Sequence, residues 1–176
     1  AIRLLHPTIK TASLVMSETK GEAGEKGLEA INKRLLALNI NLKNVKRVPH
    51  DAEAIAMALA GLKTALLLNL TSSATSDIND VAPVAVRKAG GQVTCFGMPV
   101  DPDNLLFLGS LGDKPVIGLP GCARSVALNG TDWILSRIAC GVSCSAESFA
   151  EMSVGGLLKE IPTRPQPRRP NLTKFS

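Results

Sequence analysis

Aromatic and histidine residues are scarce in this 176-residue chain, which has no tyrosine, one tryptophan, four phenylalanines and two histidines. A protein with so few rings has little on which to stack nucleic-acid bases. The net charge of +5 does not point to nucleic acid either, because residues 159–176 carry five cations against one acid and the remainder is nearly neutral. We therefore expect no nucleic-acid partner.

The chain also lacks closely spaced metal ligands and long apolar runs. Its cysteines, at positions 95, 122, 140 and 144, include no Cys-x-x-Cys pair, and two histidines are too few to suggest a zinc site. We expect reduced, mostly buried thiols, no bound metal and a cytoplasmic location. No apolar run approaches the ~18–20 residues needed to cross a bilayer, so we expect no membrane contact.

Small and aliphatic residues are abundant instead, and hydrophobic residues make up 45% of the chain. That content and length suit one globular domain, which we place at residues 1–150. A basic, Pro-rich tail or linker follows at residues 151–176. Its prolines, at 162, 165, 167 and 170, favour an extended conformation.

Strand-like and helix-like segments alternate through residues 11–141. Strands are predicted at 11–17, 41–48, 64–70 and 92–98, and two more within 104–119, joined by a turn at Gly112-Asp113. Helices are predicted at 25–39, 51–62, 80–91 and 125–141. Short apolar strands separated by helices are typical of a parallel sheet covered on both faces. We therefore predict an α/β fold, a three-layer α/β/α sandwich with a mostly parallel central sheet.

Two predicted strand-to-helix loops carry features that bind anions, and each also has a plainer interpretation. The first follows the apolar strand 64–70 and offers five hydroxyl groups, from Thr71, Ser72, Ser73, Thr75 and Ser76. The second follows the strand ending near Leu119 and contains Pro120, Gly121, Cys122, Arg124 and Ser125. Carboxyl ends of parallel strands meet at one edge, where helix N-termini attract phosphate. The alternatives are a solvated polar loop and a tight turn whose arginine faces solvent.

Three acidic positions and one histidine are further candidates. Asp80 is a candidate catalytic or ligand-binding acid, or simply the N-cap of the following helix. Asp101 and Asp103 flank Pro102, which favours a surface turn over a cation site. His50 precedes Asp51 in what is most simply a turn and an N-cap, and no nucleophile lies near it in the sequence.

These segments resemble a known family. "TSSATSDINDVAP" and "GLPGCARS", in that order on these predicted elements, resemble the phosphate-loop and Leu-Pro-Gly segments of the molybdopterin-binding domains of molybdenum-cofactor biosynthesis, found in the adenylyltransferase and the insertase. "VPHD", "LNGTDW" and "VGGLLKEIP" are similar to the version fused, in some bacterial proteins, to a nucleotidyltransferase-like domain. The resemblance implies a molybdopterin-binding-domain-like fold, a pterin phosphate ligand, possible use of Mg²⁺, and a homo-oligomer, either trimer or dimer.

The chain departs from the family pattern at places that concern catalysis. Residues 71–75 replace Thr-Gly-Gly-Thr-Gly, residues 102–105 replace Pro-Gly-Lys-Pro, and His50 stands where the adenylyltransferase has an aspartate. We therefore expect binding of molybdopterin or a molybdenum-cofactor precursor through its phosphate, with presentation to a fused or partner nucleotidyltransferase, rather than full adenylyl transfer or metal insertion. The alternatives are a nucleotide pyrophosphatase of the competence-damage type and a non-catalytic oligomerisation module.

Overall fold

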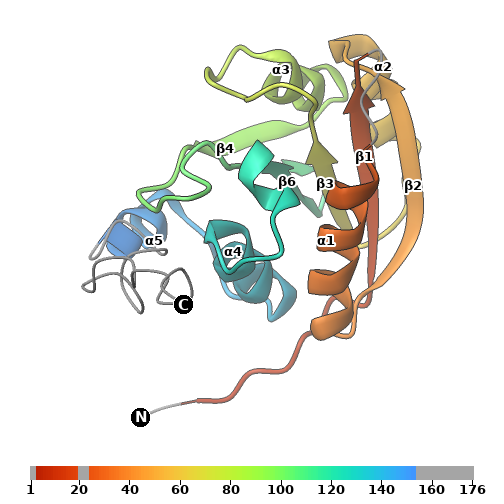
Figure 1. Ribbon diagram of the computed structural model, residues 1–176. Helices are drawn as coiled ribbons and strands as arrows, with labels where there is room; N and C mark the ends of the chain where they lie inside the picture. The colour runs from red at the N-terminus through yellow and green to blue at the C-terminus, as the bar shows by residue number, and fades with distance from the viewer. Residues whose placement is uncertain (1–2, 20–23, 154–176) are drawn as a thin grey trace, which may run out of the picture.

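The computed structural model describes residues 3–19 and 24–153, and Figure 1 shows how their helices and strands are arranged. Along the chain the elements are β1 (Thr11–Glu18), α1 (Glu25–Ala37), β2 (Asn41–Pro49), α2 (Ala52–Ala60), β3 (Leu66–Leu70), α3 (Val81–Lys88), β4 (Gln92–Phe96), β5 (Phe107–Leu111), β6 (Lys114–Leu119), η1 (Gly121–Arg124), α4 (Gly130–Ala139), α5 (Ala146–Ala150) and η2 (Glu151–Ser153). The Pro-rich tail predicted from residue 151 lies, from residue 154 on, outside the described residues, so the domain boundary stays a prediction. None of the described helices is long and apolar enough to cross a membrane.

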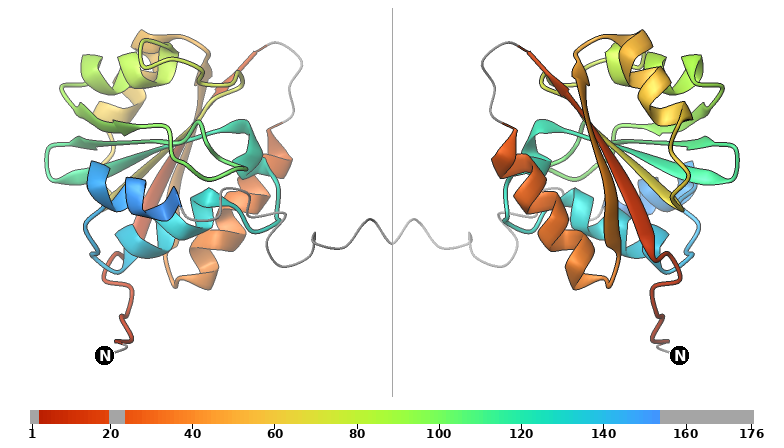
Figure 2. Two further views of the ribbon diagram at one scale, coloured as in Figure 1. Left: turned by 90° about the vertical axis from the view of Figure 1, so that its left-hand side faces the viewer. Right: turned by 90° about the vertical axis from the view of Figure 1, so that its right-hand side faces the viewer.

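The six strands form one sheet in the order β2-β1-β3-β6-β5-β4. The pairs β1/β2, β1/β3 and β3/β6 are parallel, whereas β5 is antiparallel to both β6 and β4. Helices α2 and α3 cover one face, and α1, α4 and α5 cover the other (Figure 2). The predicted three-layer sandwich with a mostly parallel sheet is therefore confirmed.

Strand β3 lies inside the sheet, between β1 and β6, and all five of its residues are buried. Side chains alternate between the two faces of a strand, so Leu66, Leu68 and Leu70 pack in the α1/α4 layer while Leu67 packs in the α2/α3 layer. The same alternation places Asn69 on the α2/α3 face, near the carboxyl end of the strand. A polar residue thus lies in the most buried strand, just before the hydroxyl-rich loop.

The last long helix begins later than its sequence pattern predicts. A helix was expected from residue 125, but Gly121–Arg124 forms a short 3-10 turn and α4 starts at Gly130. The backbone N–H of Asn129 donates to the Asp132 carboxylate, which marks the helix start. Gly130 therefore occupies the first turn and does not weaken the middle of the helix. Arg124 lies in the 3-10 turn and not at the α4 N-terminus.

The cysteines are less buried than expected. All four thiols are free, but Cys95 alone among them is buried, Cys140 and Cys144 are half-buried, and Cys122 is exposed. The expectation of mostly buried thiols is therefore wrong. Burial raises the pKa of the Cys95 thiol and of the Cys144 thiol above the ordinary value, which favours their neutral forms.

Candidate functional site

The two predicted binding loops meet at one edge of the sheet. Strands β3 and β6 are parallel neighbours, with Leu70 beside Leu119, so the chain leaves both at the same side. Arg124 Nη2 donates a hydrogen bond to the carbonyl oxygen of Thr71 at 2.8 Å, which joins the loops directly. The structure therefore brings together the two loops that the sequence suggested.

A cavity of about 200 Å³ opens beside Arg124. Its lining comes from β1, the start of α1 and the 3-10 turn, and comprises Met16, Ser17, Glu18, Gly24, Lys26, Gly27 and Arg124. The Arg124 side chain lies across Gly27, where a Cβ atom would come within 3.1 Å of Arg124 Cγ. Glu18 is already paired with Arg47. Among the described lining residues, Lys26 and Arg124 therefore give an excess of positive charge.

Most residues that line this cavity were not among those predicted from the sequence to bind a ligand. Among the described residues predicted to bind ligand, Arg124 alone lines the cavity, and the rest belong to the two loops beside it. The segment that follows β1 is polar and charged in sequence, but it lacks a cluster of hydroxyl residues like that at 71–76. Its glycines, at positions 24 and 27, are the available signal, because small residues at a helix start let another side chain approach closely.

The hydroxyl-rich loop is bonded partly to itself and partly to other segments. Thr71 and Thr75 are buried, and Thr71 Oγ1 donates to the carbonyl oxygen of Ser73 at 2.8 Å. Asp80 occupies the N-cap position of α3, as predicted, but makes no side-chain bond to that helix. Its carboxylate instead accepts from the N–H groups of Ser76 at 2.6 Å and Asp77 at 3.0 Å. Those two loop N–H groups are therefore satisfied within the protein.

His50 lies between two serines that are distant from it in the sequence. Its Nδ1 is 2.8 Å from Ser17 Oγ at the end of β1, and its Nε2 is 2.8 Å from Ser73 Oγ in the β3–α3 loop. The sequence around this histidine contains no nucleophile, and both serines reach it from other segments of the chain. Three separate segments meet at its ring because β1, β2 and β3 are parallel neighbours.

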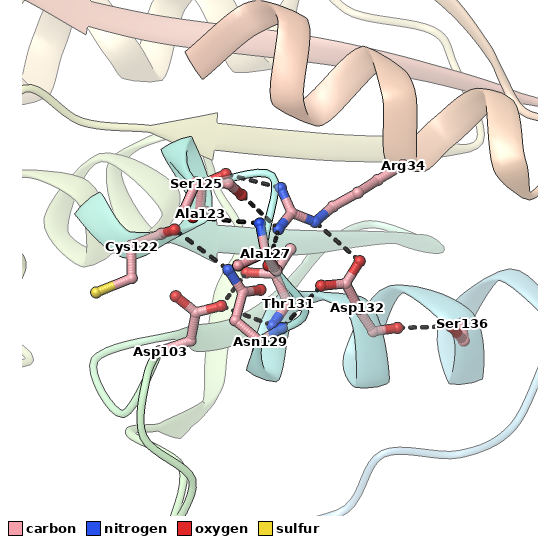
Figure 3. Close-up of polar contacts among 10 residues, drawn as sticks. All are labelled: Arg34, Asp103, Cys122, Ala123, Ser125, Ala127, Asn129, Thr131, Asp132 and Ser136. Carbon is pink, nitrogen blue, oxygen red and sulfur yellow. Dashed lines mark hydrogen bonds and ion pairs between the residues drawn. The ribbon is translucent and has the colours of Figure 1, made fainter. Parts of the chain in front are cut away.

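A buried arginine holds the second loop in place (Figure 3). Arg34 on α1 is buried, and its Nε donates to Asp132 at 2.9 Å. Its Nη1 and Nη2 donate to three carbonyl oxygens of the segment that contains η1, those of Ala123 at 2.8 Å, Ser125 at 2.7 Å and Ala127 at 3.1 Å. Sequence analysis missed this clamp, although Arg34 interrupts the apolar stripe of Ile31 and Leu35.

Asp103 is not part of a surface turn, as its sequence context suggested, but is fully buried. Its Oδ2 accepts from the backbone N–H of Thr131 at 2.8 Å and from the Thr131 hydroxyl at 2.7 Å, so it caps the start of α4. Burial raises the pKa of this carboxyl above its ordinary value, against the smaller lowering effect of the two hydrogen bonds. Asp101, its predicted companion, remains exposed.

The described residues do not include a metal-binding cluster. Within residues 3–19 and 24–153, no three histidine, cysteine, aspartate or glutamate side chains lie where they could hold one ion. Asp80, the acid that best matches the family pattern, has a carboxylate oxygen occupied by two N–H groups. These residues do not fit a resident magnesium ion.

The fold is shared with solved structures of low sequence identity. The protein CinA of unknown function from Thermoplasma acidophilum matches 74% of this chain and 96% of its own, at 13% identity and a TM-score of 0.56. The molybdopterin biosynthesis enzyme MoaB from Thermus thermophilus matches 83% and 98%, at 15% identity and a TM-score of 0.53. The chain has the fold of MoaB and CinA. A molybdopterin biosynthesis protein from Mycobacterium abscessus matches 82% and 97%, at 13% identity and a TM-score of 0.52.

No protein-family model and no curated protein matches the sequence of the chain. The likeness to solved structures therefore establishes the arrangement of helices and strands. A shared fold does not determine function, which depends on the residues at the carboxyl edge of the sheet.

Proposed function

We propose that this domain binds molybdopterin, or a precursor of the molybdenum cofactor, through its phosphate group. The fold is that of proteins of molybdopterin biosynthesis. In open α/β sheets, ligands bind beyond the carboxyl ends of the strands, which is where the loops after β3 and β6 meet. These loops after β3 and β6 are also the segments whose sequences resemble the molybdopterin-binding family.

The proposal depends on the position and the unpaired charge of Arg124 within the described residues. It is half-buried, joins the two loops through Thr71, and forms no ion pair within the described residues. A guanidinium group has five N–H donors, so one bond to a carbonyl leaves donors for a phosphate. Lys26 adds to the same cavity a second cation that has no ion pair within the described residues. A phosphate is the ligand group that this charge favours.

The size of the cavity limits which part of the ligand it can enclose. Sites that enclose drug-sized molecules usually measure roughly 300–1,000 Å³, whereas this cavity measures about 200 Å³. We infer that it takes the phosphate end and that the pterin rings lie outside it, over the exposed parts of residues 71–80 and 121–125. The other candidate residues of those loops, Ser76, Gly121, Cys122 and Ser125, are exposed and would contact the rings.

The proposal extends to the partners of the domain. The domain presents the bound pterin to a nucleotidyltransferase-like domain or protein, and the Pro-rich segment from residue 151 is the connection. It works as a homo-oligomer. No reaction step is assigned to Asp80, because its carboxylate already binds two loop N–H groups.

Substitution of Arg124 tests the proposal. Arg124→Ala should weaken binding of inorganic phosphate by about tenfold to a hundredfold, because a charge-assisted hydrogen bond contributes roughly 1.5–3 kcal/mol. Isothermal titration calorimetry measures the affinity. Pterin that co-purifies with the protein, oxidised to a fluorescent form and quantified, should fall in the variant.

Arg137→Ala is the matched control, because Arg137 lies on α4 and donates to the carbonyl oxygen of Trp133, away from both loops. Equal phosphate affinity in the Arg124 and Arg137 variants, with equal pterin content, would show that the cavity is not the phosphate site. Thermal melts of both variants confirm that they are folded.

A further inference from the structure

A hydrogen-bonded chain of side chains runs from the buried end of β1 to the protein surface. The Ser72 N–H donates to Ser17 Oγ at 3.2 Å, Ser17 Oγ is bonded to His50 Nδ1, and His50 Nε2 is bonded to Ser73 Oγ. Ser17 is only 2% exposed, whereas Ser73 is exposed. The chain therefore begins in the interior and ends in solvent.

The bonding of Ser17 determines the direction of the chain. Its oxygen already accepts the Ser72 N–H, and its hydroxyl hydrogen has no acceptor other than His50 Nδ1 among the described residues. A buried hydroxyl that donates to nothing is unfavourable, so Ser17 donates to Nδ1. A neutral imidazole then carries its hydrogen on Nε2. Nε2–H donates to Ser73 Oγ, and the Ser73 hydroxyl hydrogen has no acceptor among the described residues.

We propose that Ser17, His50 and Ser73 form a one-directional donor relay whose last member, the Ser73 hydroxyl, binds an oxygen of an oxyanion ligand. This rests on the proposed function and names a second contact for the same ligand. Ser73 is the contact residue, and His50 and Ser17 position it. Hydrogen bonds in such a chain polarise one another, which strengthens the last donor. The ligand group that suits a lone terminal donor is an acceptor such as a phosphate oxygen.

Unpartnered polar atoms beside the relay point to the same kind of ligand. Ser72 Oγ and both amide atoms of Asn69 have no hydrogen-bond partner within the described residues, and Asn69 is 1% exposed. Asn69 is paired with Val15 across the sheet and lies on the face that Ser17 also occupies, two residues further along β1. A polar edge with spare hydrogen-bonding capacity therefore borders the terminal donor.

The direction of the relay is tested by nitrogen NMR of the imidazole rings. The chain has two histidines, so a His6→Gln variant assigns the signals of His50. At a pH where the ring is neutral, His50 should show a protonated Nε2 and an unprotonated Nδ1. Ser17→Ala should remove that preference and give a mixture of tautomers. A wild-type ring protonated on Nδ1 overturns the proposal, because Ser73 would then donate to His50.

Phosphate titrations test whether the relay acts on a ligand. Ser73→Ala and Ser17→Ala should each weaken binding of inorganic phosphate roughly threefold to tenfold, as expected for the loss of one uncharged hydrogen bond. His50→Gln, whose amide can accept and donate in the same sense, should bind better than His50→Ala. Ser136→Ala is the control, since this exposed serine on α4 donates only to its own helix. Thermal melts verify that every variant is folded.

The outcomes separate this inference from the proposed function. Weaker binding in Arg124→Ala with unchanged binding in Ser73→Ala and Ser17→Ala leaves the phosphate site in place and rejects the relay. Unchanged binding in Arg124→Ala together with weaker binding in Ser73→Ala supports the relay and rejects the cavity beside Arg124. A loss in Ser73→Ala without any loss in Ser17→Ala makes Ser73 a simple contact and rejects the positioning role.

Discussion

The β3–α3 loop (residues 71–80) and the β6–α4 loop (residues 120–129) leave the same edge of the sheet but are held differently. The first is held by local bonds, chiefly from Asp80 to two nearby N–H groups, and by one bond each to Ser17, His50 and Arg124. The second is held from a distance by Arg34, whose bonds to its carbonyl oxygens span 89 to 93 residues of sequence. Figure 3 shows this clamp reaching from α1.

The difference shows that polar richness and rigidity are separate properties of a loop. The β3–α3 loop has many hydroxyls, yet most of its residues are exposed. The β6–α4 loop includes the exposed Val126 and Leu128, at 68% and 58%, yet its carbonyl groups are held by one buried guanidinium. We therefore expect the loop with Arg124 to be the firmly positioned half of the site and the loop with Ser73 to be the adaptable half.

The largest expected effect is that of removing the clamp. Arg34→Ala leaves Asp132 and three loop carbonyls without their partner, and the free energy of unfolding should fall by about 3–5 kcal/mol, as when one member of a buried ion pair is removed. Urea denaturation measures it. Arg34→Lys keeps the charge but not the fork of donors, so its loss should be intermediate.

Arg47→Ala is the comparison for Arg34, because Arg47 pairs with Glu18 and Glu25 at an exposed site. Exposed ion pairs contribute little to stability, so this variant should lose far less. If the two alanine variants lose the same stability, then the long-range clamp is no stronger than a surface pair and the contrast between the loops fails.

A smaller loss is expected from the local anchor of the other loop. Asp80→Ala removes the acceptor of two loop N–H groups and should cost about 1–2 kcal/mol. Amide hydrogen exchange at Ser76 and Asp77 should accelerate. Asp77→Ala, which removes one bond to the Asn79 N–H, should cost less. A loss as large as that of Arg34→Ala would show that both loops are held with equal strength.

The smallest expected effect is a pH dependence at the start of α4. Because burial raises the pKa of the Asp103 carboxyl, the folded protein holds that proton more tightly than the unfolded chain. This contribution to stability is fully present below the ordinary pKa of about 4 and is lost as the pH rises through the raised value. Wild type should therefore lose stability relative to Asp103→Asn over that window, as measured by urea denaturation. A difference that does not change with pH contradicts this.

Much of the fold could be predicted from local patterns. The leucine-rich run of β3 indicates a strand buried on both faces, and the alternation of strands and helices indicates a parallel sheet. Parallel strands end at the same edge of a sheet. The meeting of the loops after β3 and β6 could therefore be predicted once both strands were assigned to the parallel part of the sheet. The start of α4 was placed wrongly because apolar periodicity extends upstream of Asn129, whose bond to Asp132 marks the real beginning.

The details of the candidate site depend on long-range packing. Ser17 lies 33 residues from His50, and Arg34 lies 98 residues from Asp132, so no local pattern pairs them. Sequence periodicity reports which face of an element is apolar, whereas a hydrogen bond depends on which elements are neighbours and how far each side chain reaches. Strand order brought Ser17, His50 and Ser73 together, and the packing of α1 against the β6–α4 loop buried Arg34. Polar partners of this kind become visible only once the sheet and its helices are assembled.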